Sequence, residues 1–146
     1  MVELKPITEE NFPAIMGMKR PEGEGFVAFN ERSLAQAWLY RDAGDVFPFA
    51  IYADGQPVGF MMLDEDVEER MLMLWRIMFP EKHANRGYGG QAIQMVIDLA
   101  QASGKYDRMV LDYVPGNERA AHLYEKLGFC PAGEISHGEV VMELKF

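Results

Sequence analysis

The segment HANRGYGGQAIQ, residues 83 to 94, gathers glycines just before apolar residues at helical spacing. Gly87, Gly89 and Gly90 leave the backbone uncovered, and the first turn of a helix adds unpaired N–H groups and the positive end of its dipole. These features favour a phosphate or pyrophosphate, to which Arg86 can donate a charge-assisted hydrogen bond. The alternative is that the glycines only permit a tight turn. The candidate anion-binding residues are Asn85, Arg86, Gly87, Tyr88, Gly89 and Gly90.

Two known phosphate-binding motifs can be compared with this loop. A P-loop requires Lys and then Ser or Thr after its last glycine, whereas Gln91 and Ala92 follow here, so a P-loop is excluded. A dinucleotide-binding fingerprint fits better, because Ala92 satisfies its relaxed form and an acidic residue, Asp107 or Asp112, follows at a suitable distance. The glycines nevertheless follow the fourth expected strand rather than the first. A dinucleotide-binding oxidoreductase therefore ranks second.

The glycine loop is expected where a strand leads into a helix. The predicted order of elements is β α α β β β α β α β β, in a single mixed α/β domain over residues 1–146. Residues 20–26 are expected to form a loop. Strands are expected at 2–6, in two apolar runs joined by a hairpin through 54–57, at 71–79, at 108–114, and in a hairpin around 136–138. Helices are expected after Thr8 as a cap, at 34–43 with Ser33 as N-cap, from the glycine loop to about 102, and at 118–128.

Composition limits the possible partners. The net charge of −9 argues against nonspecific binding to nucleic acid and suits a cationic or amine-bearing partner. A single cysteine, Cys130, rules out an internal disulfide framework, and the first ten residues resemble no signal peptide. No apolar run approaches the roughly 20 residues of a membrane span, and the three histidines are not at metal-ligand spacing with Cys130. We expect a cytoplasmic protein without metal, nucleic-acid partner or membrane segment.

Two segments together resemble the GNAT superfamily of acetyl-CoA-dependent N-acetyltransferases. The first is ANRGYG, residues 84–89, and the second is NERAAHLYEKLGF, residues 117–129. Ala84 departs from the family pattern, which usually has Gln or Arg there. FVAFNERSLAQAW, FAIYADGQPVGFMML and GYGGQAI are also similar to the small-amine branch that includes bacterial spermine and spermidine acetyltransferases. The resemblance implies an α/β (α+β) fold with a mixed, mostly antiparallel central sheet of about six to seven strands and helices on both faces.

The resemblance also implies roles for individual residues. Backbone groups of Ile77, Met78 and Phe79 would hold the pantetheine arm of CoA, and residues 85–90 its pyrophosphate. Asn117 would contact the pantetheine, with helix capping alone as the alternative. Tyr124 would be the general acid, or instead a core tyrosine. A free thiol has a pKa of about 8.5 and tyrosine about 10, so full proton transfer to the thiolate is uphill by roughly 2 kcal/mol and Tyr124 is expected to act as a donor to developing charge.

The acceptor amine must lose a proton before it reacts. Asp112 is the candidate base, because some protein-acetylating members carry a carboxylate at this position; a solvated or paired strand-end acid is the alternative. Five acidic residues at 64–69 could attract a polycation or form a solvated turn. The expected reaction is direct acetyl transfer to a primary amine, a polyamine or other small amine, by a possible homodimer. A non-catalytic acyl-CoA sensor and an acetyltransferase acting on protein N-termini or amino sugars stay open as alternatives.

Overall fold

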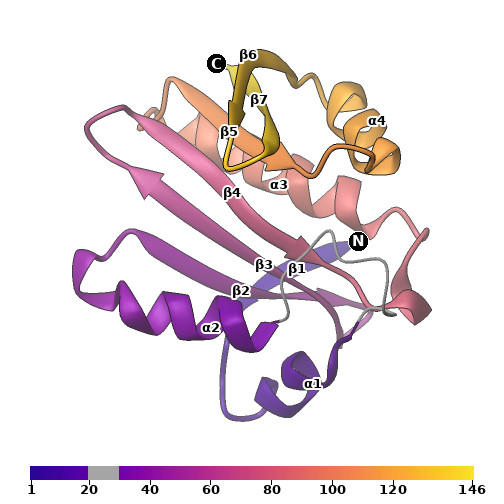
Figure 1. Cartoon of the computed structure of the whole chain (residues 1–146). Helices are drawn as coiled ribbons and strands as arrows, with labels where there is room; N and C mark the ends of the chain where they lie inside the picture. The colour runs from indigo at the N-terminus through magenta and orange to yellow at the C-terminus, as the bar shows by residue number, and fades with distance from the viewer. Residues whose placement is uncertain (20–29) are drawn as a thin grey trace.

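The chain winds through one sheet flanked by helices (Figure 1). A computed structural model describes residues 1–19 and 30–146; the loop expected at 20–26 lies outside the described residues. The strands are β1 (Val2–Pro6), β2 (Val46–Ala53), β3 (Gln56–Asp66), β4 (Met71–Met78), β5 (Arg108–Tyr113), β6 (Cys130–Ser136) and β7 (Glu139–Lys145). The helices are α1 (Phe12–Gly17), α2 (Asn30–Leu39), α3 (Tyr88–Ser103) and α4 (Glu118–Lys126), with short 3-10 turns η1 (Arg41–Ala43) and η2 (Glu81–His83).

The strand order explains why the sheet is mixed. It runs β1-β2-β3-β4-β5-β7-β6, and every neighbouring pair is antiparallel except β4 and β5. Those two strands are joined through α3, and a crossover helix of this kind is what a parallel pair requires. The expected fold class, a mixed and mostly antiparallel sheet with helices on both faces, is confirmed.

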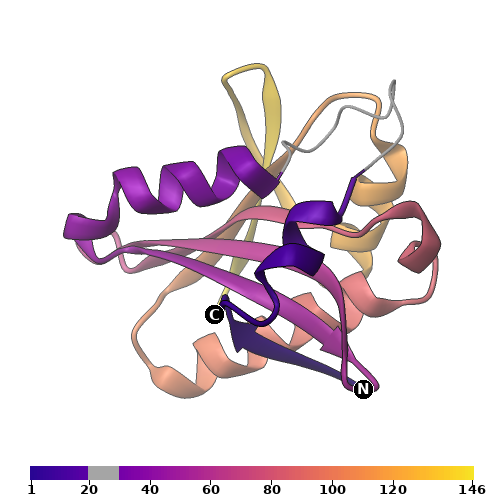
Figure 2. The same cartoon turned by 90° about the horizontal axis from the view of Figure 1, so that it is seen from below.

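Two apolar clusters hold the helices to opposite faces of the sheet (Figure 2). On one face, α3 buries the stripe of apolar residues at 92, 93, 96, 97 and 100 against residues such as Met61 and Leu74. On the other face, Ile15 and Met18 from the α1 segment, with Leu34 of α2, pack over Phe60. No helix in the described part of the chain is both long and apolar enough to span a bilayer.

The sheet opens in its middle, where β4 and β5 separate. They pair only between Met71–Leu74 and Arg108–Leu111, so β4 continues beyond the last pair with no partner on its β5 side. β5 also continues, but its last two residues pair with β7 alone. A gap between diverging strands exposes backbone groups and side chains of both strands to the same space. The candidate site lies at this opening.

A β-bulge directs two consecutive β4 side chains toward α2. Met62 of β3 lies opposite Arg76, whereas Leu63 lies opposite Leu74, so Trp75 is an extra residue. Trp75 packs against the cluster beneath α1 and α2, and Arg76 donates hydrogen bonds to two side chains of α2. In a regular strand these neighbours would point to opposite faces. The bulge therefore brings Arg76 to the α2 side of the opening.

The boundary predicted for the second helix was wrong. Ser33 is not its N-cap, because the described helix already includes Asn30 and ends at Leu39, before the separate turn η1. Ser33 is fully buried within α2, and its hydroxyl accepts a 3.2 Å hydrogen bond from Nη1 of Arg76. A partner from a distant strand therefore satisfies the hydroxyl that the prediction had assigned to capping.

The first helix begins later than its predicted cap. Thr8 opens a turn in which its hydroxyl accepts the N–H of Asn11 at 3.3 Å, while Asn11 Oδ1 accepts the N–H of Thr8 at 2.8 Å. Asn11 is the N-cap residue, and α1 starts at Phe12. The hairpin predicted through residues 54–57 is confirmed: Asp54 and Gly55 both have positive φ angles, as a two-residue turn of this kind requires.

Gly59 is a position where a methyl group should destabilise the protein. A Cβ there would lie 2.5 Å from Cε1 of the Phe79 ring and 2.9 Å from the carbonyl oxygen of Met78. Because the second contact is backbone, Gly59→Ala is expected to lower the free energy of unfolding by about 1–3 kcal/mol. Thermal denaturation should show a reduced Tm, and Gly17→Ala, where a Cβ meets nothing within 4 Å, is the control. Equal Tm values for the two variants would contradict the prediction.

Candidate active site

The glycine loop opens α3 as expected. Gly87 is the N-cap residue with a φ of 79° and supplies no side-chain cap. The N–H of Gln91 bonds to the carbonyl of Gly87 at 3.2 Å, so the amides of residues 88–90 precede the helical hydrogen-bond ladder. Gly87 needs its positive φ, but Gly89 and Gly90 do not. Their small size instead keeps the approach to these amides open.

One cavity of about 380 Å³ collects the residues predicted to bind the cofactor. We call it the loop cavity. It lies between the end of β4, the glycine loop and α4. Its lining includes all of the predicted positions: Ile77, Met78, Phe79, Asn85, Arg86, Gly87, Tyr88, Gly89, Gly90 and Asn117. The structure therefore brings together backbone and side chains from three separate parts of the sequence.

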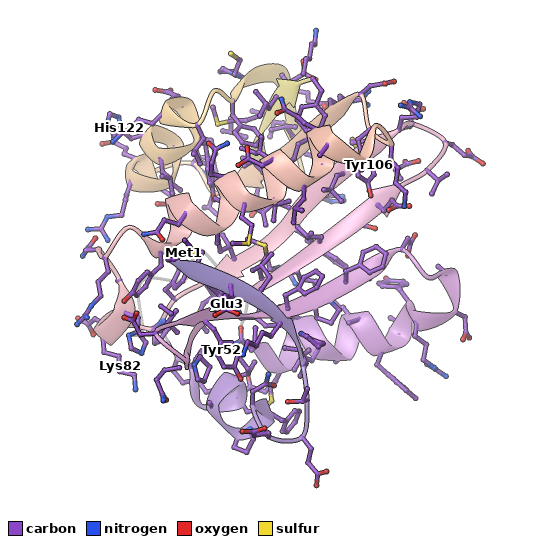
Figure 3. The ribbon with its side chains drawn as sticks, turned by 180° about the vertical axis from the view of Figure 1, so that it is seen from behind. Met1, Glu3, Tyr52, Lys82, Tyr106 and His122 are labelled. Carbon is purple, nitrogen blue, oxygen red and sulfur yellow. The ribbon has the colours of Figure 1, made fainter. Side chains whose placement is uncertain are left out.

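The loop cavity is lined by cationic side chains although the whole chain is strongly acidic. Arg86 comes from the glycine loop and Arg119 and Lys126 come from α4, with His83 and His122 beside them. No Asp or Glu is among its described lining residues, in a chain of net charge −9. Figure 3 shows His122 on α4 and Lys82 on η2 at the same side of the molecule. This segregation of charge suits a polyanion. The prediction from sequence included only Arg86, since the cations of α4 are distant in the chain.

The lowered pKa of His83 is consistent with the positive charge around the loop cavity. Burial lowers its pKa, and the nearby charges of Lys82 and Arg86 lower it further. Its Nδ1 is buried without a hydrogen-bond partner among the described residues. The imidazole is therefore neutral at neutral pH. Because positive neighbours disfavour a further positive charge, the cavity mouth favours an anion instead.

A second cavity of about 870 Å³ adjoins the loop cavity. It lies where β4 and β5 diverge, beneath α2 and the β6–β7 turn, and we call it the acceptor cavity. Ile77, Asn117 and Tyr124 line both cavities. Asn117 Oδ1 also accepts the N–H of Ala120 at 3.3 Å, so the residue does cap α4. Both volumes are within the range of small-molecule sites.

Tyr124 lies at the boundary between the two cavities. Its side chain is buried, and its ring lies 6.3 Å from the rings of both Tyr113 and Phe129. Burial raises its pKa to about 12, and the negative charges of Asp112 and Glu139 act in the same direction. The phenol is therefore protonated at neutral pH and can act only as a proton donor. It is a core tyrosine and a cavity residue at once.

Asp112 is paired with another carboxyl group rather than with a cation. It lies on β5 opposite Val141, and Glu139 of β7 is two residues from Val141 on the same face of the sheet. Burial, and after it the nearby carboxyl group of Glu139, together raise the pKa of Asp112 to about 6, whereas Arg76 and His137 oppose the shift. Two neighbouring carboxyl groups disfavour each other's ionisation, because their charges repel. Sequence reasoning missed Glu139, which only the register of β5 and β7 places here.

The raised pKa of Asp112 predicts a pH-dependent gain in stability for Asp112→Asn. At pH 7.5 the carboxylate of Asp112 is ionised in both the folded and the unfolded protein. Because its folded-state pKa of about 6 is above its ordinary value, this ionisation lowers the free energy of unfolding. The variant should gain on the order of 1 kcal/mol, allowing for the half-exposed side chain, or about 2–4 °C in Tm. Below about pH 4 both states are protonated and the gain should vanish. Thermal denaturation at both pH values tests this, with the exposed turn variant Asp54→Asn as control.

The acidic run at residues 64–69 lies outside both sites. Tyr106 donates a 2.5 Å hydrogen bond to Oε2 of Glu65, and Figure 3 labels Tyr106 far from Lys82. Asp66 Oδ1 accepts the N–H of Glu69 at 3.0 Å, and Glu69 lies 3.6 Å from Arg108. The described lining of the loop and acceptor cavities includes none of this run. The first three acidic residues belong to the end of β3 and the last two lie in the turn that follows, so the contacts favour acids with partners in the protein over a polycation site. No group of three metal-ligating side chains occurs among the described residues.

The comparisons with known proteins agree with this geometry. The model of the acetyltransferase (GNAT) family matches residues 8–129. Spermidine N(1)-acetyltransferase of Escherichia coli K12 is 26% identical over 89 residues, which are 61% of this chain and 48% of that protein. The chain thus spans about half the length of the curated relatives it matches.

Solved structures show the same fold over nearly the whole chain. PaiA N-acetyltransferase of Thermoplasma acidophilum, in complex with coenzyme A, is 15% identical with a TM-score of 0.77, covering 100% of this chain and 99% of that one. Spermidine N-acetyltransferase of Vibrio cholerae, in complex with CoA and spermine, is 17% identical with a TM-score of 0.74, covering 99% and 95%. Because the family model matches most of the sequence, the chain belongs to the acetyltransferase (GNAT) family.

Proposed function

We propose that this protein is an acetyl-CoA-dependent N-acetyltransferase that moves an acetyl group to a primary amine. The observation that carries the proposal is the loop cavity, where cations and open backbone amides gather without any carboxylate among the described lining residues. It shares Tyr124 with the acceptor cavity, so that a donor and an acceptor can meet. Relatives solved with coenzyme A support the choice of cofactor.

The residues of the loop cavity fit the chemical groups of CoA. The amides at the start of α3 and the side chain of Arg86 would hold the pyrophosphate. The side of β4 that has no β5 partner, at Ile77 and Met78, offers backbone groups to the amides of pantetheine. Phe79 and Leu123 would pack beside it. When bound, acetyl-CoA supplies the activated acetyl group.

The acid–base groups have complementary roles in this reaction. The acceptor ammonium loses one proton to Asp112 and Glu139, and from there it passes to solvent. The amine nitrogen then bonds to the thioester carbon, and the carbon–sulfur bond breaks. The nitrogen loses its second proton, which ends on the sulfur of CoA, so that CoA leaves as the free thiol. Tyr124 donates a hydrogen bond to the departing sulfur. With its pKa at about 12, complete transfer of its own proton to a thiolate is uphill by about 5 kcal/mol.

Polyamines are one class of acceptor that the relatives suggest. The Vibrio cholerae structure contains spermine, and the curated relatives are spermidine acetyltransferases. Amino sugars, protein N-termini and a non-catalytic acyl-CoA sensor are the alternatives. A homodimer, a single domain over 1–146, a cytoplasmic location and the absence of metal, membrane and nucleic-acid partners stay predictions.

Thiol release from acetyl-CoA tests the proposal. The wild-type protein should turn over with at least one amine in a panel of spermine, spermidine, an amino sugar, a diamino acid and a peptide with a free N-terminus. CoA should raise the Tm, and NAD should not, because only a ligand of the native state stabilises it. A Tm shift with NAD alone would favour the dinucleotide-binding alternative. CoA binding without acetylation of any amine would favour the sensor.

A further inference from the structure

The acceptor cavity carries both signs of charge. Arg32 and Arg76 lie on the α2 side, and Asp112 and Glu139 lie on strands β5 and β7. The two carboxyl groups carry up to two negative charges, and the charge of Glu139 disfavours ionisation of Asp112. The two guanidinium groups carry two positive charges. Among the described lining residues the two signs of charge are therefore close to balance, within a chain of net charge −9.

The hydrogen bonds that the structure gives Arg76 all go to neutral groups. Its Nη1 donates to Ser33 Oγ at 3.2 Å and to Gln36 Oε1 at 2.8 Å, and its guanidinium lies 5.0 Å from the centre of the Trp75 ring. Among the described residues it forms no ion pair with Asp112 or Glu139. Burial lowers its pKa and the charge of Arg32 lowers it further, whereas the charges of Glu139 and Asp112 act in the opposite direction. Arg32 and Arg76 line the same cavity, so their two guanidinium groups can donate hydrogen bonds to one oxyanion.

The charge distribution is unfavourable for a polycation. Spermidine and spermine carry several ammonium groups, whereas the described lining of this cavity includes one pair of carboxyl groups. Further ammonium groups would lie near Arg32 and Arg76, where like charges repel. A molecule with one ammonium and one oxyanion would instead match both walls, with apolar contacts from Trp75 and Tyr40 between them.

We propose that the acceptor is a small amine that also bears an oxyanion, a carboxylate or a phosphate, with the oxyanion bound by Arg32 and Arg76 and the ammonium by Asp112 and Glu139. This inference rests on the proposed acetyltransferase function. The β-bulge at Trp75 makes this binding mode possible, because the bulge turns Arg76 toward the acceptor cavity.

Matched pairs of amines test the proposal by changing only the oxyanion. Each free amino acid in a set that includes alanine, glutamate and lysine is compared with its carboxamide, and phosphoethanolamine is compared with ethanolamine. Thiol release from acetyl-CoA gives kcat/KM, and titration calorimetry in the presence of CoA gives affinity without turnover. We expect at least one oxyanion-bearing amine to exceed its neutral partner by about tenfold or more in kcat/KM or affinity. The pair that responds distinguishes carboxylate from phosphate.

Variants of Arg76 separate oxyanion binding from a structural role. Arg76→Gln should lower kcat/KM for the preferred oxyanion-bearing amine about 10- to 100-fold and leave its neutral partner within about threefold. Arg76→Lys, which keeps the charge but loses the planar fork, should fall between them. A merely structural role would reduce both substrates equally. Arg41→Gln is the matched control, because Arg41 stacks on Trp38 outside the cavity.

The outcomes distinguish this inference from the proposed function. Failure of CoA to bind would overturn the proposed function itself. A kcat/KM of the wild-type protein for spermine or spermidine that exceeds its kcat/KM for every oxyanion-bearing amine would keep the acetyltransferase and overturn the oxyanion proposal. The absence of any preference for an oxyanion over its neutral partner, in binding and in turnover, would overturn it as well.

Discussion

Replacing Tyr124 with phenylalanine is expected to lower kcat for acetyl transfer by about 100-fold while leaving the KM for acetyl-CoA nearly unchanged. The side chain is buried at the boundary of the two cavities, and its pKa of about 12 keeps it protonated through the reaction. Its hydroxyl therefore contributes where negative charge develops on the departing sulfur rather than in holding the cofactor. Interactions that strengthen only in the transition state change kcat more than KM.

Steady-state kinetics with acetyl-CoA as the varied substrate would measure this effect. Tyr106→Phe is the matched control, because burial also raises the pKa of Tyr106 to about 12, and a hydrogen bond to Glu65 acts in the same direction, yet the residue lines neither cavity. Its kcat should stay close to wild type. If Tyr124→Phe retains full activity while binding CoA, Tyr124 has only its packing role against Tyr113 and Phe129.

The parts of the site that depend on local sequence were predictable. Glycines before an amphipathic helix predicted the open start of α3, and Asn117 before a helix predicted its cap. The predicted cofactor residues do meet in one cavity, because the order of strands and helices brings β4, the glycine loop and α4 together. Their contacts with CoA stay predictions.

The acceptor side depends on contacts between distant residues and was largely missed. Glu139 reaches Asp112 only through the register of β7 on β5. Arg76 faces the cavity because of a bulge, and a pattern of alternating residues in the strand would have placed it on the other face. Ser33 was misassigned for the same reason, since its partner Arg76 is 43 positions away in the chain. Patterns within one element do not record such pairings.

Gly89→Val is expected to raise the KM for acetyl-CoA and the Kd for CoA by about 10- to 100-fold without destabilising the protein. A Cβ at Gly89 would already lie 3.5 Å from Phe79 Cε2 and 3.7 Å from Leu123 Cδ2. The two additional methyl groups of valine would therefore crowd the loop cavity beside the amides that begin α3. Valine also has a higher helix propensity than glycine, so reduced affinity cannot be attributed to loss of the helix.

Titration calorimetry with CoA and thermal denaturation with and without CoA would separate these effects. The variant should keep the wild-type Tm in the absence of ligand and lose most of the increase that CoA produces. Ala102→Val, at an exposed position in the last turn of the same helix, controls for a β-branched residue in α3. A CoA affinity within about twofold of wild type would contradict the prediction. Such a result would mean that Gly89 serves the turn into α3 rather than the approach of the pyrophosphate.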